Sequence, residues 1–142
     1  MITSRRLTAG DYDAILALWQ RAGLDSIRPQ GRDSREAFAD QLAHGQVVLG
    51  LEDAGKLVAC VVITDDTRKG WINRLAVDPA YRRQGLGARL VAEAENDFRA
   101  RGFKIFCALI ENENTASLNL FRREKYKTHD IVYVSKRDGE DV

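Results

Sequence analysis

The chain has 142 residues, of which 44% are hydrophobic and 30% charged, and its formal net charge is +1. A chain of this length can bury a core of its own, so we expect a single domain over residues 1–142. The balanced charge gives no bulk field that would recruit nucleic acid or an anionic membrane, and neither partner is expected. The first residues lack the apolar run of a signal peptide, so a cytoplasmic location is expected.

The first half of the chain predicts a strand, two helices and a hairpin. The first helix should begin at Thr8, whose side chain is preferred at helix N-caps, and end at Gly23. A second helix should open at the capping-box pattern of residues 33–36. Asp53-Ala54-Gly55 is a hairpin turn between two runs rich in Val, Ile and Leu. The expected elements are a strand at 2–7, helices at 8–23 and 33–44, and strands at 46–52 and 56–64.

The second half predicts alternating strands and helices. Asp78-Pro79 ends one strand, because proline cannot donate a ladder hydrogen bond. Two strands joined through a helix should be parallel neighbours, so the fold class is α+β, or mixed α/β, with about six strands and four helices. The expected elements are strands at 71–77, 104–110 and 127–136, helices at 86–101 and 115–125, and a frayed tail at 137–142.

Cys60 and Cys107 each lie inside an apolar, strand-like run. They show no Cys-x-x-Cys spacing, and the two histidines lie elsewhere. We expect two buried free thiols and no metal site, because a buried cysteine behaves as a small hydrophobic residue.

The most informative stretch is residues 82–88, which read Arg-Arg-Gln-Gly-Leu-Gly-Ala. Two glycines entering a helix let the backbone approach a ligand and leave several N–H groups free at the helix start. Such a site favours an anion, most naturally phosphate, and the arginines add charged donors. The alternative is a tight turn that merely starts a helix. Neither the dinucleotide fingerprint nor the P-loop pattern fits these residues.

Two motifs carry a resemblance to a known family. Arg82, Gly85 and Gly87 fill the pattern Arg/Gln-x-x-Gly-x-Gly/Ala, which resembles the pyrophosphate-binding signature of the GNAT superfamily of N-acetyltransferases. Asn114, Ser117 and Leu120 match a second recurring pattern of that family, Asn-x-x-Ala/Ser-x-x-Leu-Tyr. The two motifs occur in the family's order, separated by an expected helix and strand. The resemblance is close over residues 70–130 and covers the first half only by element order.

The resemblance implies a central, mostly antiparallel sheet in which a bulge splays the fourth strand from the fifth. Acetyl-CoA would be the cosubstrate, and the Val77 amide would polarise the thioester carbonyl. The activity implied is acetyl transfer to a primary amine of a small molecule, a peptide or a protein N-terminus, by direct attack in a ternary complex. The implied cofactor-binding residues are Leu75, Ala76 and Val77 for pantetheine, Arg82, Arg83, Gln84, Gly85, Leu86, Gly87 and Ala88 for pyrophosphate, and Asn114 and Ser117 for the far end of pantetheine.

The chain departs from the family pattern at the catalytic positions. Related enzymes often place a glutamate base on the fourth strand, but Asn73 and Arg74 stand there. Glu111 is the nearest carboxylate in sequence and a candidate base, although a solvated turn residue is the alternative. Phe121 replaces the tyrosine that protonates the departing thiolate, and Tyr126 and Tyr133 could substitute for it or could simply pack.

One further departure concerns the backbone. Lys125 stands where a glycine in a left-handed turn is usual, so either the turn differs or some strain is accepted.

The acceptor should lie against the first two helices and their loop, which vary in this family. Arg28, Arg32 and Arg35 in that region could contact a carboxylate or an acidic peptide, or could be a solvated charged loop. A homodimer is retained as an option, because dimers are common in the family. The main rival function is a non-catalytic acyl-CoA-binding module, which the missing glutamate and tyrosine would explain.

Overall fold

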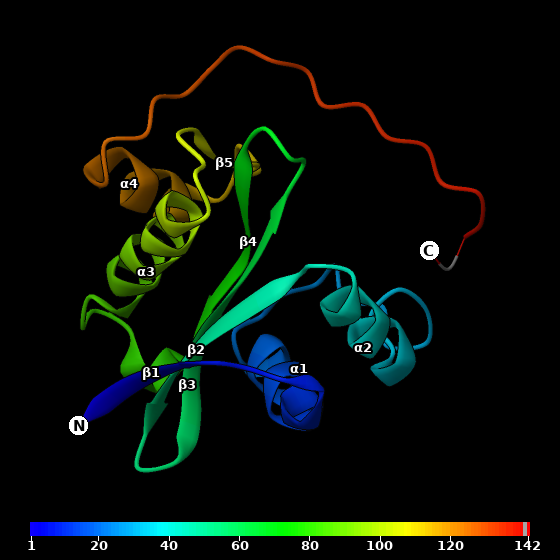
Figure 1. Cartoon of the computed structure of the whole chain (residues 1–142), viewed down its shortest axis with the longest axis vertical. Coiled ribbons are helices and arrows are strands. Elements are labelled where there is room, and N and C mark those ends of the chain that lie inside the picture. The colour runs from blue at the N-terminus through cyan, green and yellow to red at the C-terminus, as the bar shows by residue number, and fades with distance from the viewer. Residues whose placement is uncertain (141) are drawn as a thin grey trace.

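A five-stranded sheet forms the centre of the computed structural model, which describes residues 1–140 and 142. The strands follow one another across the sheet in chain order (Figure 1). Neighbouring strands are antiparallel except for the last pair, which is parallel as expected. The strands are β1 (Ile2–Arg6), β2 (Val47–Asp53), β3 (Lys56–Asp65), β4 (Gly70–Val77) and β5 (Phe106–Ala108).

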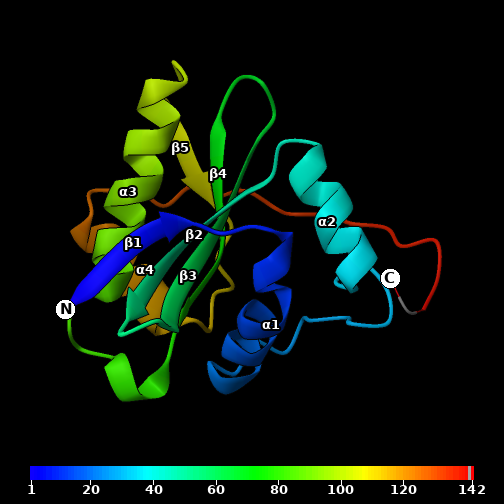
Figure 2. The same cartoon turned by 60° about the horizontal axis from the view of Figure 1, so that its bottom comes forward.

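Two pairs of helices cover the two faces of the sheet. The first pair lies on one face and the second pair on the other, as Figures 1 and 2 show. Because both faces are covered, every residue of β3 from position 57 to position 63 is buried, and the strand reads as a continuous apolar run. The helices are α1 (Tyr12–Arg21), α2 (Arg35–Ala43), α3 (Leu86–Ala100) and α4 (Thr115–Arg123).

Most turn and cap residues behave as their chemistry predicts. The hairpin turn between β2 and β3 holds Ala54 and Gly55 at φ +50° and +82°, as the twist of a tight hairpin requires. The N-cap of α2 is Ser34, one residue later than the capping-box pattern predicts, and its side chain accepts from the Ala37 N–H at 3.1 Å. Asp33, which the capping-box pattern predicts as the N-cap, instead forms an ion pair with Arg74. Lys125 adopts φ +74°, so the strained alternative is the correct one.

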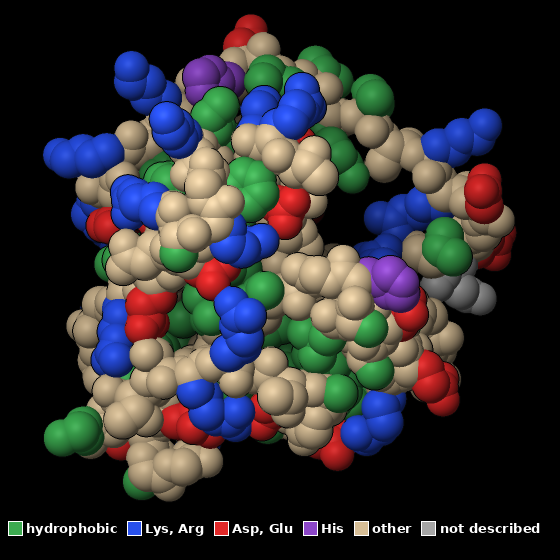
Figure 3. All heavy atoms as spheres, viewed as in Figure 1, with side chains coloured by type: hydrophobic (Ala, Val, Ile, Leu, Met, Phe, Trp, Pro, Cys, Tyr) green, Lys and Arg blue, Asp and Glu red, His purple; other side chains and the backbone are tan. Residues whose placement is uncertain are grey.

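The prediction of a sixth strand was wrong. Residues 127–136 form no strand, and the strand expected at 104–110 is only three residues long. Ile131 and Val132 are 78% and 82% exposed. Figures 1 and 3 show this part of the chain standing away from the body. An isolated strand has no partner for its backbone hydrogen bonds, so its β-branched composition alone does not order it.

Among the described residues, no helix is long and apolar enough to cross a membrane. Cys60 is buried as expected, whereas Cys107 is only half-buried, and both are free thiols.

Candidate functional site

The candidate site begins where β4 and β5 separate. The two strands pair only at three positions, from Gly70 opposite Phe106 to Ile72 opposite Ala108. Strand β4 continues to Val77, so its second half has no partner on the β5 side in the described structure. The expected splay between these strands is therefore present, and it leaves backbone groups of β4 open to a ligand.

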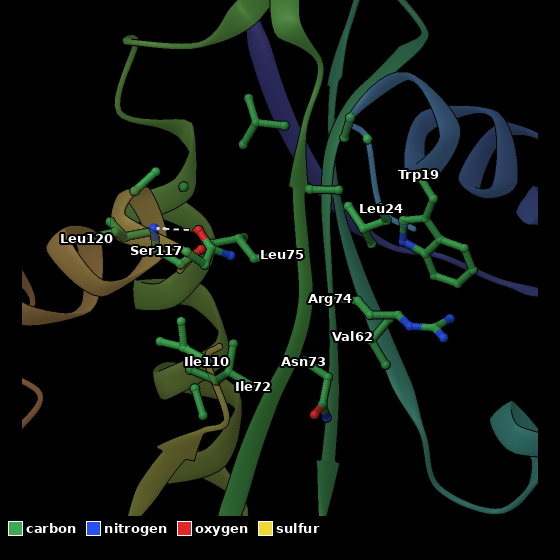
Figure 4. A pocket seen from close by; sticks show the side chains of 18 of the residues that line it. Trp19, Leu24, Val62, Ile72, Asn73, Arg74, Leu75, Ile110, Ser117 and Leu120 are labelled. Carbon is green, nitrogen blue, oxygen red and sulfur yellow. Dashed lines mark hydrogen bonds between the residues drawn. The ribbon is translucent and has the colours of Figure 1, made fainter. Parts of the chain in front are cut away.

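A β-bulge in β4 marks the same place. Asn73 pairs with Val62 and Ala76 with Cys60, so Arg74 and Leu75 both lie opposite one residue of β3. Arg74 has φ +45°, a left-handed conformation that arginine rarely adopts. As a result Arg74 and Leu75 project to opposite sides of the strand (Figure 4).

The backbone of β4 has a definite direction after the bulge. The Asp78 N–H donates to the Val58 carbonyl at 2.8 Å, so residue 78 faces β3. Successive residues of an antiparallel strand face opposite edges. The Val77 N–H therefore points away from β3, toward the side on which β5 has diverged.

An open cleft of about 1070 Å³ surrounds this splay. It extends from the α3 and α4 side of β4 to the α1 side, and the side chains in Figure 4 lie on both sides of the strand. Gln84 and Arg28 do not line it. The expected site residues that do line it are Arg32, Leu75, Ala76, Val77, Arg82, Arg83, Gly85, Leu86, Gly87, Ala88, Glu111, Asn114 and Ser117.

The start of α3 has the properties expected of an anion site. Gly85 is the N-cap and has φ +76°, and a Cβ at this position would meet nothing within 4 Å. The helix's first backbone hydrogen bond runs from the Arg89 N–H to the Gly85 carbonyl, at 3.0 Å. The N–H groups of Leu86, Gly87 and Ala88 precede that bond and have no acceptor within the helix.

Gly87 has a different physical role from Gly85. A Cβ at Gly87 would lie 3.1 Å from the Leu120 side chain, which is tighter than normal packing. Gly87 therefore allows α4 to approach the start of α3. This contact explains why the glycine motif of α3 and the motif of α4 lie together at the cleft. Neither motif predicts the contact by itself.

The α4 motif residues have structural roles of their own. Asn114 is the N-cap of α4, and its side chain accepts from the Ser117 N–H at 3.1 Å (Figure 4). This bond fixes where the helix begins, and therefore where Ser117 and Leu120 face the cleft.

No tyrosine stands at the expected position of the general acid. Phe121 is 6% exposed and lines the cleft. Tyr126 donates to Glu95 on α3 at 2.7 Å, and burial together with this carboxylate raises the pKa of Tyr126 well above its usual value. Tyr133 lies in the exposed segment after α4. Neither of these two tyrosines lines the cleft. Tyr81 does line it, but its hydroxyl donates to the Asp53 carboxylate at 2.7 Å.

Glu111 remains a candidate base by position. It lines the cleft just after β5 and is exposed, and its backbone carbonyl accepts from the Asn114 N–H at 3.0 Å. Asn73 also lines the cleft, but its amide donates to the Thr64 hydroxyl at 3.1 Å and is held by the sheet.

On the α1 side the structure separates the three candidate arginines. Arg32 lines the cleft, whereas Arg28 donates to carbonyls of its own loop and Arg35 pairs with Asp13 at 2.6 Å. Several other residues line the cleft, and no sequence signal placed them there. These are Trp19, Leu24, Asp25, Ser26, Asp33, Gln41, Gln46, Tyr81 and Arg123.

A bulged strand that splays from its parallel neighbour and leads into a helix with unpaired N–H groups at its start is typical of an acetyltransferase-type fold. The model of the acetyltransferase (GNAT) family matches residues 12–125. The chain belongs to this family and is an acetyltransferase.

Individual proteins agree with this assignment. The chain is 28% identical over 132 residues to an acetyltransferase of Pectobacterium atrosepticum, with 92% of each chain covered. Its fold matches a PaiA N-acetyltransferase from Thermoplasma acidophilum in complex with coenzyme A, with a TM-score of 0.83 at 17% identity over 93% of each chain. It also matches the ribosomal-protein-S18-alanine N-acetyltransferase from Escherichia coli, with a TM-score of 0.75 at 25% identity, over 87% of this chain and 76% of that one.

Proposed function

We propose that the protein transfers an acetyl group from acetyl-CoA to a primary amine, by direct attack while both are bound. The observation that carries this proposal is the continuous cleft, which joins the free N-terminus of α3 to the α1 side of the sheet through the splay of β4. A cofactor can enter from one side of β4 and an acceptor from the other. The acceptor class includes small molecules, peptides and protein N-termini.

The residues present fit acetyl-CoA. The N–H groups at the start of α3, together with Arg82 and Arg83, suit a pyrophosphate. The side chains of Arg82 and Arg83 are exposed, and Arg82 makes one long hydrogen bond, to the Ala22 carbonyl at 3.3 Å, which it can exchange for an anion. The unpaired edge of β4 at Leu75 to Val77 suits the amide groups of a pantetheine arm. Asn114 and Ser117 lie at the same cleft, across from that edge.

Acetyl-CoA supplies an activated acetyl group, whose bond to sulfur breaks as the amine nitrogen bonds to the carbonyl carbon. The Val77 N–H, which points into the splay, is positioned to donate to the carbonyl oxygen as negative charge develops there. The attacking amine must first lose a proton, because an alkylammonium ion has a pKa of about 10. Glu111 is our candidate to accept that proton, directly or through water.

Protonation of the thiolate does not require a tyrosine. A thiol of pKa about 8.5 is a tolerable leaving group without assistance. Phe121 therefore slows the reaction that we propose and does not prevent it.

The two cysteines support direct transfer over an acetylated enzyme. Burial raises the pKa of the Cys60 thiol to about 12, and burial also raises the pKa of Cys107. Neither residue lines the cleft, and a thiol is a poor nucleophile until it ionises.

The test is calorimetric titration of the protein with acetyl-CoA, followed by thiol release in the presence of primary amines and short peptides. We expect micromolar binding and amine-dependent thiol release. Binding without release for any amine would favour the rival function, a non-catalytic acyl-CoA-binding module. No binding at all would mean that the glycine stretch only starts a helix.

A further inference from the structure

The α1 side of the cleft contains a cluster of three charged residues, Arg32, Asp33 and Arg74, that the proposed chemistry does not use. Arg74 projects from the bulge of β4 and forms a two-pronged ion pair with Asp33. Its Nη1 and Nη2 atoms donate to the two carboxylate oxygens at 2.5 Å and 3.0 Å. The Asp33 side chain is 6% exposed, so the carboxylate is held inside the structure.

Several contacts fix this cluster in place. The Arg74 guanidinium stacks over the buried Trp19 ring, with its carbon 4.8 Å from the ring centroid. Asp33 also accepts from the Arg28 backbone N–H at 2.8 Å, and its own carbonyl accepts from the Tyr12 hydroxyl at 2.5 Å. The loop before α2 is thereby tied to the bulge, and Arg74 cannot turn away from the cleft without breaking this network.

The ion pair leaves part of Arg74 free. A guanidinium has five N–H groups, and the end-on pair with Asp33 uses one on each Nη atom. In the described structure the Nε–H and the other N–H groups of Arg74 have no protein acceptor, and 21% of the side chain is exposed. Arg74 lines the cleft. A second edge of its guanidinium, formed by the Nε–H and a neighbouring Nη–H, thus remains available to a ligand there.

Arg32 adds a second positive charge to the same carboxylate. Its Nε lies 3.8 Å from Asp33, its Nη2 donates to the Ser26 carbonyl at 2.6 Å, and 35% of the side chain is exposed. Two guanidinium groups therefore share one carboxylate, and the cluster has a net charge of +1. The fourth charged residue on this side is Asp25, an exposed carboxylate outside this network.

This arrangement suits one kind of acceptor. A carboxylate bound between Arg32 and the free edge of Arg74 would complete an alternating set of charges, with charge-assisted hydrogen bonds that an uncharged group cannot make. An acceptor with several ammonium groups would face two arginines and a single exposed aspartate.

We propose that the Arg32–Asp33–Arg74 cluster binds a carboxylate of the acceptor, so that the substrates are amines that also have a carboxylate. This inference rests on the proposed function, because it names the acceptor class for that cleft. Arg74 and Arg32 are then specificity-determining residues, and Asp33 is a positioning residue that acts through Arg74.

The test compares ω-amino acids, from glycine to 6-aminohexanoate, with their primary amides at saturating acetyl-CoA. Rates are expressed per concentration of uncharged amine, because the carboxylate alters the amine pKa. At the best chain length we expect the acid to exceed the amide in kcat/KM by about tenfold, mainly through KM. The KM for acetyl-CoA should not depend on which member of the pair is used.

Substitutions test whether the preference for acids over amides depends on the cluster. Arg74→Gln and Arg32→Gln should each bring the ratio of acid to amide close to one, and Arg74→Lys should keep part of it. Arg32 lies in the turn before α2 and is not part of a strand, so Arg32→Gln serves if Arg74→Gln fails to fold. Arg68→Gln, at an exposed turn away from the cleft, should keep the full preference. Equal use of acids and amides, or a preference that survives Arg32→Gln, would overturn the inference.

A binding measurement separates this inference from the proposed function. The CoA-loaded protein is titrated with the N-acetylated acids and N-acetylated amides, which need no turnover. Tighter binding of the acids by wild type than by Arg32→Gln would support the cluster even if no amine were acetylated. Acetylation of amines without any such difference would leave the proposed function standing and remove the carboxylate site.

Discussion

The ring of Phe121 meets the ring of Tyr126 edge to face, with centroids 5.0 Å apart and an angle of 83° between the planes. The pair fixes the end of α4 against the core, and the Tyr126 hydroxyl is directed to Glu95. The position that a catalytic tyrosine would occupy thus belongs to a ring without a hydroxyl, and the nearby tyrosine is committed to α3.

Restoring the hydroxyl should help the reaction. Because Phe121 lines the cleft, we expect Phe121→Tyr to supply a general acid and to raise kcat. The gain should be about 10²-fold or less, at or below the low end of the usual range for acid assistance, because a thiolate is already a good leaving group. The KM for acetyl-CoA should change little. A lower kcat in a variant of unchanged stability would contradict this account of Phe121.

Removing the hydroxyl of Tyr126 should affect stability alone. Tyr126→Phe loses the hydrogen bond to Glu95, which should lower the free energy of unfolding by about 1 kcal/mol in urea denaturation. The dependence of kcat on pH should be identical to that of wild type. A pH profile that loses a limb in this variant would show that Tyr126 takes part in proton transfer.

The two glycines with positive φ at either end of α3 provide a matched pair of substitutions. Gly85 and Gly102 have φ +76° and +89°, and a Cβ at either would meet nothing within 4 Å. Gly85→Val and Gly102→Val should therefore cost similar stability, about 1–2 kcal/mol. Only Gly85→Val should abolish acetyl-CoA binding in calorimetry, because its side chain covers the N–H groups at the helix start. Equal affinities for the two variants would refute the phosphate site.

The candidate base can be tested against a neighbour in the same turn. Glu111 lines the cleft and Glu113 does not. Glu111→Gln should lower kcat by about 10²-fold or more, the usual contribution of a general base, while Glu113→Gln should leave it unchanged. The loss should shrink at alkaline pH, where the amine is already uncharged. Similar rates for both variants would make Glu111 a solvated turn residue.

The ion pair of Asp33 and Arg74 predicts how stability depends on pH. Burial by itself would raise the pKa of Asp33, but hydrogen bonds from Arg74 and from the Arg28 N–H outweigh it, and the pKa is lowered. A carboxyl whose pKa is lowered by folding stabilises the protein above its unfolded pKa of about 3.9, and this contribution is lost as the pH falls through the folded value.

Asp33→Asn should therefore be less stable than wild type by about 2 kcal/mol near neutral pH. The difference should begin to close as the pH falls below about 4, where the carboxyl of the unfolded chain takes up a proton, and should be lost below the lowered pKa of the folded protein. Urea denaturation across that range measures it. A difference that stayed constant with pH would mean that the carboxylate charge contributes nothing.

The backbone on the α3 and α4 side of the cleft could be predicted from the sequence because its signals are local. Gly85 is needed for a left-handed N-cap, and Asn114 caps a helix three residues before Ser117, so each motif specifies its own backbone. The motifs do not predict that the start of α3 and helix α4 pack against each other. That depends on the contact between Gly87 and Leu120, which lie on different helices.

The arrangement on the α1 side of the cleft could not be predicted, because its geometry is non-local. Arg74 and Asp33 are 41 positions apart in sequence, and the bulge that aims Arg74 at Asp33 forces an arginine to a positive φ. No local sequence pattern predicts a positive φ at an arginine. The strand expected at 127–136 is absent for a related reason, since β-branched residues favour a strand only where a neighbouring strand edge is available for pairing.

The most direct test of the account is initial-velocity kinetics of thiol release, with the concentrations of acetyl-CoA and an amine acceptor both varied. Direct transfer in one cleft predicts double-reciprocal lines that converge, and no release of thiol before amine is added. Parallel lines, with a burst of thiol and an acetylated protein in the absence of amine, would contradict it.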